Sequence, residues 1–164
     1  MRATTRHCDL NFTGGFTLFE FLIVVAILSV VGGAGLVYGM DAFRAGAFRS
    51  DRATLHALLW RARSQAMNCV CLGSGCADAR PHGVYINSAL GTYTLFQGES
   101  YATRDAEVDY VVAASPVVTR SGISEVVFAA RTAIPNVLGD IVLSGGGRVS
   151  TTTIGQEGRI RWTH

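Results

Sequence analysis

The sequence predicts an α+β protein in which a long N-terminal helix, apolar in its first half, packs on a β-rich C-terminal domain. Residues 16–40 form an apolar run that contains a single charged residue, Glu20. Residues 41–68 place apolar side chains three and four positions apart, which is the spacing of one helix face. Beyond residue 80 the pattern changes to short runs rich in β-branched and aromatic residues, separated by turn-forming residues.

The apolar run is long enough to cross a membrane. At about 1.5 Å per residue, a helix over residues 16–40 spans roughly 38 Å, more than the ~30 Å hydrocarbon core of a bilayer. The whole chain is 49% hydrophobic and 16% charged, a composition that argues against a disordered protein. The net charge of +2 is too small to indicate nucleic-acid binding by itself.

The segment that precedes the apolar run, residues 1–15, is polar and ends in Gly14 and Gly15. A secretory signal peptide has a shorter apolar core, and its small-residue cleavage site follows that core. Here the small residues come first. We therefore expect any cleavage to occur before the helix and to leave the helix in the mature chain.

Glu20 lies near the start of the apolar helix and has two interpretations. In the first, its carboxylate reaches the lipid headgroups or interacts favourably with the positive end of the helix dipole. In the second, it awaits a cationic partner, because an unpaired charge at mid-bilayer costs up to about 3 kcal/mol. Cleavage between Gly15 and Phe16 would create a positively charged amine about one helical turn from Glu20. In an assembly, the amine of one copy would neutralise the carboxylate of a neighbour.

The stretch GFTLFEFLIVVAIL, residues 15–28, resembles the class III leader junction of the type IV pilin superfamily. The match includes Gly15 and Phe16 on the two sides of the cleavage site, then Thr17, Leu18 and Glu20. The apolar helix that follows is also part of it. The resemblance implies a leader over residues 1–15 that a prepilin peptidase removes, followed by N-methylation of Phe16. It also implies that Glu20 serves this methylation and docking into a growing filament.

The same resemblance implies a location and partners. The chain would lie in the cytoplasmic membrane as a single-pass protein, with its domain outside the cytoplasm, and then enter a pilus or pseudopilus. Its partners would be the peptidase, other pilin or pseudopilin subunits, an inner-membrane assembly platform and membrane lipid. Unlike many pilins, the helix has no proline. We expect it to bend or melt locally during assembly at its glycines, which cost about 1 kcal/mol each relative to alanine: Gly32, Gly33, Gly35 and Gly39.

The rest of the chain is predicted to form the second half of the helix and a domain over residues 69–164. The amphipathic half, 41–68, continues the apolar half, so we expect one helix from about 17 to 67 that closes at Asn68. The expected strands number about six to eight and include residues 82–87, 92–98, 107–113, 125–131, 140–145, 147–154 and 159–164. Turns are expected at residues 88–91 and 155–158.

Three cysteines crowd into the stretch CVCLGSGC that follows the helix: Cys69, Cys71 and Cys76. A domain outside the cytoplasm permits disulfides. We expect a loop closed by Cys71–Cys76 or by Cys69–Cys76, with one thiol left over. An alternative is a zinc site formed by these cysteines with His82, although the spacing C-x-C-x4-C-x5-H is not that of a standard zinc finger.

The C-terminal stretch Gly158-Arg159-Ile160-Arg161 loosely resembles the end of minor pilins and of the minor pseudopilins of type II secretion. Strand alternation places Arg159 and Arg161 on one face, with Ile160 and Trp162 on the other. In one interpretation the arginines face water while Ile160 and Trp162 pack inward. In the other, Arg159 and Arg161, together with Arg148, bind DNA phosphates, as the resemblance to DNA-uptake minor pilins implies.

No catalytic constellation stands out. The histidines are scattered, and the glycine clusters lack the lysine of a phosphate-binding loop. We expect no cofactor and no metal, and therefore a structural, non-enzymatic subunit of a type IV pilus or of a type II secretion-like pseudopilus. Two alternatives remain open: a minor pilin that binds DNA during uptake, and a membrane-anchored ectodomain without a filament role.

Overall fold

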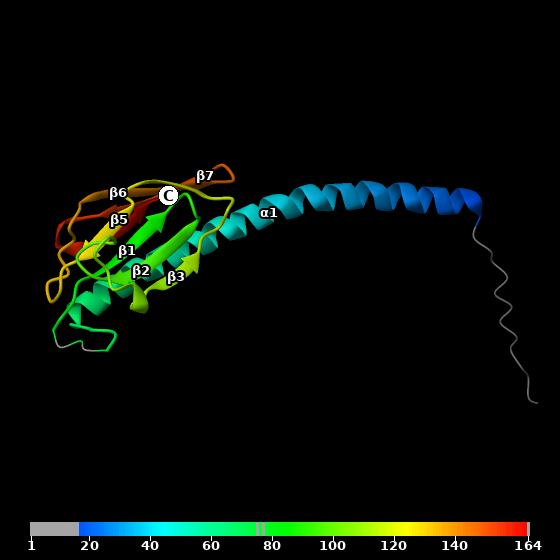
Figure 1. Cartoon of the computed structure of the whole chain (residues 1–164). Helices are drawn as coiled ribbons and strands as arrows, with labels where there is room; N and C mark the ends of the chain where they lie inside the picture. The colour runs from blue at the N-terminus through cyan, green and yellow to red at the C-terminus, as the bar shows by residue number, and fades with distance from the viewer. Residues whose placement is uncertain (1–16, 75, 77, 164) are drawn as a thin grey trace, which may run out of the picture. The chain divides into compact units, whose positions relative to one another are not determined.

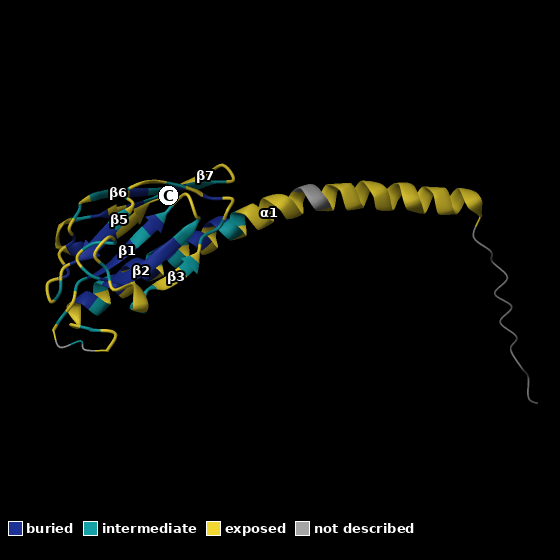
Figure 2. Ribbon diagram, in the orientation of Figure 1, coloured by how far each residue is buried: buried dark blue, intermediate teal, exposed yellow. Residues whose placement is uncertain are grey.

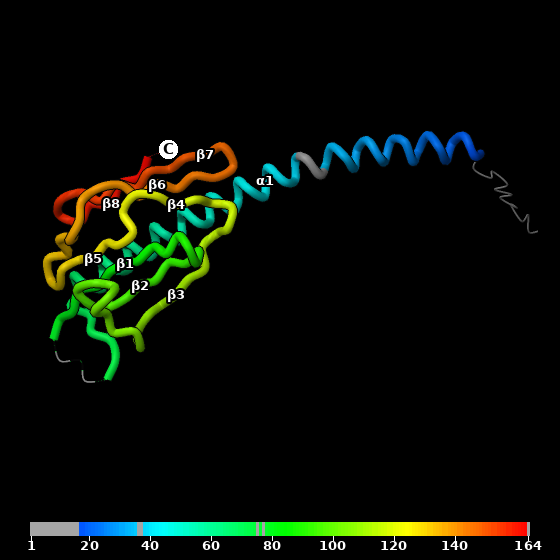
Figure 3. The backbone as a smooth tube through the Cα atoms, turned by 45° about the horizontal axis from the view of Figure 1, so that its top comes forward, coloured from blue at the N-terminus to red at the C-terminus, as the bar shows by residue number. Residues whose placement is uncertain are grey.

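The computed structural model describes residues 17–74, 76 and 78–163. The chain divides into two compact units, Met1–Gly39 and Met40–His164. The expected leader and both residues of its cleavage site, Gly15 and Phe16, lie outside the described residues. Figure 3 labels the long helix and all eight strands, and Figure 1 labels most of them. In chain order the elements are α1 Leu18–Met67, β1 His82–Asn87, β2 Thr92–Gln97, η1 Ala106–Val108, β3 Tyr110–Ala113, β4 Thr119–Gly122, β5 Glu125–Phe128, β6 Gly139–Gly145, β7 Arg148–Ile154, η2 Gln156–Gly158 and β8 Ile160–Thr163.

Both ends of α1 are closed by local hydrogen bonds. At the start, the Thr17 hydroxyl oxygen accepts a hydrogen bond from the backbone N–H of Glu20 at 3.2 Å, which satisfies one of the free N–H groups of the first turn. At the end, Val70 N–H bonds to Gln65 C=O and Cys69 N–H to Ala66 C=O. This is a Schellman motif, and Cys69 occupies its left-handed position with φ 54°, where glycine is more usual.

The first part of α1 is apolar and exposed. An 18-residue window of this helix reaches a mean hydropathy of 2.5 and none of it is buried, so α1 is long and apolar enough to cross a membrane. Figure 2 colours this part yellow except where it is not described. The helix runs without interruption through the glycines from Gly32 to Gly39.

The eight strands of the described residues form two antiparallel four-stranded sheets. The first has the order β3-β2-β1-β5 and the second the order β4-β6-β7-β8. In the first sheet β1 and β2 form a hairpin whose register pairs His82 with Gln97 and Asn87 with Thr92. In the second sheet β8 lies at an edge and pairs only with β7. Its register places Ile160 opposite Ile154 and Thr163 opposite Thr151.

The second half of α1 packs against both sheets, so the expected α+β architecture is confirmed. Figure 2 shows the buried residues on the strands and on this part of the helix. The helix contributes the apolar stripe that its periodicity predicts, with Phe48, Leu55, Leu58, Leu59, Ala62 and Ala66 all at most 4% exposed. The sheets supply side chains that include Val84, Tyr93, Leu95, Val126, Phe128, Ile141, Leu143 and Ile154.

The strand predictions were wrong in detail at several places, and the strand expected over 125–131, for example, ends at Phe128. Strand β4, Thr119–Gly122, was not expected, because its sequence TRSG lacks an apolar alternation and the strand is defined by its pairing with β6. The strand expected over 107–113 begins only at Tyr110. Before it, the Asp105 carboxylate accepts a hydrogen bond from Glu107 N–H at 3.2 Å and caps the short η1 helix, a local bond that competes with strand formation.

Candidate functional site

The first candidate site is the start of α1, where Glu20 is an exposed residue in the first turn. The spacing Thr17-x-x-Glu20 is that of a capping box, and Thr17 makes its half of the arrangement by accepting the Glu20 N–H. A carboxylate here stabilises the positive end of the helix dipole and can also accept a cationic partner from outside the chain. The large apolar residues on both sides of Glu20 are exposed, among them Leu18 at 79% and Phe21 at 63%.

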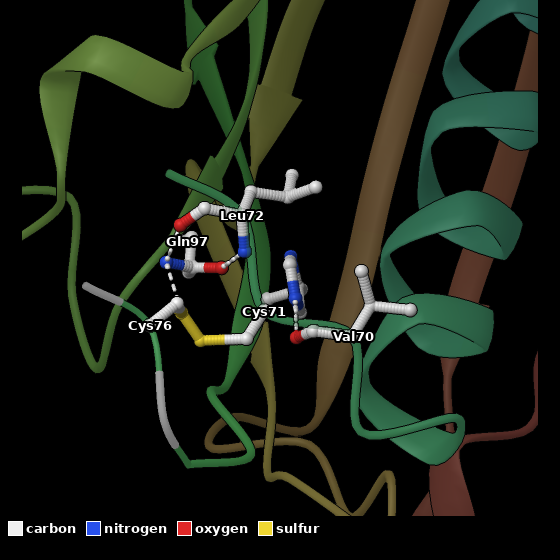
Figure 4. Close-up of a disulfide and its surroundings, with 6 residues drawn as sticks. Val70, Cys71, Leu72, Cys76 and Gln97 are labelled. Atoms are coloured by element: carbon white, nitrogen blue, oxygen red, sulfur yellow. Dashed lines mark hydrogen bonds between the residues drawn. A yellow bond between two sulfur atoms is a disulfide. The ribbon is translucent and has the colours of Figure 1, made fainter. Parts of the chain in front are cut away.

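The second candidate is the loop between helix and sheet, shown in Figure 4. Of the two pairings expected from the sequence, the structure contains the disulfide Cys71–Cys76, with a Cα–Cα distance of 5.7 Å. Cys69 is a free and exposed cysteine. The buried Gln97 side chain holds the loop, because it accepts from Leu72 N–H at 2.7 Å and donates to Leu72 C=O at 3.1 Å. These bonds attach the disulfide loop to the end of β2.

His82 fastens the same loop from β1. Its Nε2 donates to the Val70 carbonyl at 2.9 Å, and the residue is 1% exposed. Burial lowers the pKa of His82 below the ordinary histidine value, although the hydrogen bond to Val70 opposes this shift. The zinc alternative is contradicted, because Cys71 and Cys76 are bonded to each other and His82 bonds to backbone. No cluster of metal-binding side chains occurs within the described ranges.

The third candidate is the C-terminal arginine group, and the structure separates it. Arg161 in β8 pairs with Thr153 of β7, whereas Arg148 lies at the opposite end of β7, opposite Gly145. Positions 148 and 153 are five residue steps apart along β7, which corresponds to about 17 Å. Arg148 therefore lies away from Arg161 along the sheet, a separation that could not be read from the sequence because it depends on strand order. DNA binding by these arginines stays a prediction.

The remaining pair, Arg159 and Arg161, is exposed beside an open depression of about 460 Å³ lined by Thr153, Gly155, Gln156, Glu157, Arg159 and Arg161. Arg159 Nε lies 3.4 Å from a Glu157 carboxylate oxygen, and both side chains are more than half exposed. This ion pair contributes little to stability. It reduces the positive potential that Arg159 offers to an anion.

Gly158 fixes where this segment turns. Its φ is +68°, and a Cβ at this position would lie 2.4 Å from the Ala133 carbonyl oxygen and 3.0 Å from Arg63 Nε. Only glycine combines that backbone conformation with such a close approach. The inward face of β8 is formed partly as expected, since Ile160 is 8% exposed but Trp162 remains 46% exposed.

A buried polar network, which the sequence analysis missed, joins α1 to both sheets. Asp51 Oδ2 accepts from the Tyr93 hydroxyl and from Arg120 Nη2, each at 2.8 Å, and its Oδ1 accepts from Ser115 N–H at 2.8 Å. Arg120 Nε donates to the Tyr93 oxygen at 2.7 Å. The Asp51 and Arg120 side chains are 2% and 4% exposed.

The network also sets the ionisation of its tyrosine. Burial raises the pKa of Tyr93, and the neighbouring Asp51 carboxylate adds to this rise while Arg120 opposes it. Tyr93 therefore stays protonated and keeps its role as donor to Asp51. Each side-chain nitrogen and oxygen atom of this ion pair has a protein partner. Its role is to hold α1, β2 and β4 in register.

No protein-family model matches the chain, and no curated protein or solved structure matches it significantly. The architecture alone defines the class: one helix long and apolar enough to cross a membrane, followed by a β-rich antiparallel domain. This arrangement is compatible with a pilin-like fold.

Proposed function

We propose that the chain is a structural subunit of a type IV pilus or of a type II secretion-like pseudopilus. The observation that carries the proposal is the exposed apolar part of α1 with the carboxylate of Glu20 in its first turn. The stretch of residues 15–28, with its likeness to a class III leader junction, supports it. The subunit acts by assembly and has no catalytic role.

The mechanism begins with cleavage. A prepilin peptidase removes residues 1–15 and leaves Phe16, which is then N-methylated, as the first residue. The cationic N-terminal amine of Phe16 in one copy pairs with the Glu20 carboxylate of the next copy. In hydrocarbon each charge alone is costly, about 2.5–3.5 kcal/mol for a carboxylate at mid-bilayer, so pairing across copies favours assembly. The exposed apolar side chains of neighbouring helices then pack together in the filament core.

The proposed location and partners follow from this mechanism. Before assembly the chain is a single-pass protein of the cytoplasmic membrane, with the unit Met40–His164 outside the cytoplasm. The disulfide Cys71–Cys76 suits that compartment, because the cytoplasm keeps such thiols reduced. Besides the peptidase, the partners are membrane lipid, an inner-membrane assembly platform and other pilin or pseudopilin subunits.

The test is the N-terminus of the mature protein. The chain is expressed with a prepilin peptidase, purified from membranes and analysed by mass spectrometry. The proposal expects a first residue Phe16 carrying one methyl group, and an uncut chain when the peptidase is absent. A variant with Gly15→Leu should stay uncut, while Gly14→Ala, which leaves the residue at the cleavage site unchanged, should be processed. An intact leader in the wild-type membrane form, or cleavage after the apolar run, would contradict the proposal.

A second candidate function is DNA capture by a minor pilin through Arg159 and Arg161. It is favoured by one observation, the open depression of about 460 Å³ beside these exposed arginines. Phosphate contacts of this kind weaken steeply with salt. A gel shift with duplex DNA should show binding at low salt that the double variant Arg159→Ala/Arg161→Ala loses and Arg148→Ala retains. Absence of binding at low salt would end this candidate.

A further inference from the structure

Three strand connections lie beside one another at one end of the unit Met40–His164. They follow β1, β3 and β6 and cover short segments: 88–91, 114–118 and 146–147. Ala114 N–H donates to Gly91 C=O at 2.9 Å, and a Cβ at Gly145 would lie 2.7 Å from the Val117 carbonyl oxygen. Figure 3 shows the β3–β4 and β6–β7 connections at the same end of the sheets. The three segments therefore form one surface.

Two arginines flank this surface where α1 passes it. A Cβ at Gly146 would lie 3.4 Å from Arg44 Cβ of α1 and 3.9 Å from Arg148 Nη1 of β7, so both side chains stand beside the same turn. Both arginines are exposed, and neither forms an ion pair with another described residue. Asp41, three positions before Arg44, also takes part in no ion pair of the described residues. Neighbouring cations without a counter-charge repel each other and attract an anion.

The three connections contain no acidic residue and expose apolar side chains. Leu90 is 76% exposed and Val117 41%, and an open depression of about 410 Å³ is lined by residues that include Leu90 and Pro116. The connections that follow β2 and β7 lie at the opposite end of the sheets and are acidic, with Glu99, Asp105, Glu107, Asp109 and Glu157. We call the surface formed by Arg44, Arg148, Leu90 and Val117 the basic end.

Chain connectivity keeps the basic end close to the apolar part of α1. Arg44 lies five residue steps beyond Gly39, the last residue of the unit that holds this apolar part. Five residues span at most about 18 Å in any backbone conformation, and about 8 Å in a helix. The negative potential of an anionic bilayer extends over about 8–10 Å in physiological salt. A bilayer that holds the apolar part of α1 is therefore within reach of these arginines.

We propose that the basic end binds the surface of a bilayer that contains anionic phospholipid. Arg44 and Arg148 contact headgroup phosphates, while Leu90 and Val117 enter the interfacial region. A soluble phosphate would satisfy the arginines but leave both apolar side chains in water. The inference rests on the part of the proposed function that places α1 in a membrane, and it needs neither leader cleavage nor filament assembly.

The test measures backbone hydrogen exchange of the full chain in lipid nanodiscs. One set of discs is phosphatidylcholine alone, and the other contains about one third phosphatidylglycerol, which supplies the negative surface potential. Exchange over 88–91 and 146–148 should slow in the anionic discs, whereas exchange over 155–158, at the opposite end, should be the same in both. Equal exchange of the first two segments in the two kinds of disc would overturn the proposal. The same slowing produced by inorganic phosphate in phosphatidylcholine discs would overturn it too.

Matched charge changes locate the contact. An arginine near an anionic surface strengthens binding about fivefold, so Arg44→Gln/Arg148→Gln should lower the ratio of docked to undocked molecules about 30-fold and abolish the slowing. Arg44→Lys/Arg148→Lys, which keeps both charges, should retain it. Arg159→Gln/Arg161→Gln is the control, because it removes the same charge from exposed residues at the opposite end. Slowing that survives the loss of Arg44 and Arg148, or that the control also loses, would contradict the assignment.

The result can be told apart from that of the proposed function. A chain that keeps its leader in the peptidase experiment but shows slowed exchange here would refute pilin-like processing and leave lipid binding standing. A chain that is cleaved and methylated at Phe16, but whose basic end does not respond to anionic lipid, would do the reverse. A chain that is not retained in either kind of disc would refute both.

Discussion

Replacing Asp51 by alanine tests whether the buried network holds α1 to the two sheets. The substitution removes a carboxylate that is 2% exposed and leaves the Arg120 guanidinium, 4% exposed, without its counter-charge. It also deprives the Tyr93 hydroxyl and the Ser115 N–H of their acceptor. Breaking a buried ion pair by removing one partner costs about 3–5 kcal/mol, a large part of the 5–15 kcal/mol that stabilises a typical domain.

Urea unfolding of the full chain in detergent measures this loss, and tryptophan fluorescence follows it because both tryptophans belong to the unit Met40–His164. At a slope of about 2 kcal/mol per molar urea, the midpoint should fall by about 1.5–2.5 M. The matched control is Glu157→Gln, which breaks the exposed pair with Arg159 and should change stability by less than about 1 kcal/mol.

A double variant refines the interpretation. Asp51→Ala combined with Arg120→Met removes both charges, so it should cost clearly less than the sum of the two single losses. If Asp51→Ala shifts the midpoint no further than Glu157→Gln does, the network is not what holds the helix to the sheets. Strict additivity in the double variant would likewise count against a coupled pair.

Three further predictions concern the same unit. Burial lowers the pKa of His82, so at acidic pH the unfolded chain binds more protons than the folded chain, and stability should fall as the pH drops through about 6.5 and below. The difference between the urea midpoints at pH 7.5 and pH 5.0 should therefore be smaller in His82→Gln than in the wild type. Gly158→Ala should cost more than Gly147→Ala in the same assay, by about 1–3 kcal/mol, because both have positive φ but only Gly158 would clash with backbone; equal costs would argue against the close approach. Replacing Cys71 and Cys76 by serine should lower the free energy of unfolding by about 2 kcal/mol, which is the loop-entropy value for so short a loop. An unchanged urea midpoint would show that the disulfide does not constrain the unfolded chain.

Much of the fold could be predicted from local patterns. The helix expected over 17–67 is found at Leu18–Met67, and the strand expected over 82–87 is β1 itself. These elements are set by periodicity and by turn residues, which are local properties. Strand β4 could not be found this way, because TRSG becomes a strand only through its partner β6.

The candidate sites also differ in whether they depend on local sequence or on contacts between distant segments. The signal at Glu20 is local, since it rests on one charge in an apolar run. The separation of Arg148 from Arg161 depends on strand register and was not predictable. One clue to the buried network was present, because Asp51 falls between Phe48 and Leu55 on the apolar stripe of α1. A carboxylate on a core stripe requires a buried partner, but the sequence does not say that the partner is Arg120, which lies 69 positions away.

The pairing of Glu20 with the amine of an adjoining copy is tested most directly by counting subunits in filaments sheared from cells that express Glu20→Gln, Glu20→Asp or the wild-type chain. Quantitative mass spectrometry of the filaments and of the membranes gives the fraction incorporated. We expect Glu20→Gln to remain in the membrane, cleaved and folded with its disulfide intact, and Glu20→Asp, which keeps the charge, to be partly incorporated. Incorporation of Glu20→Gln at the wild-type level would contradict it.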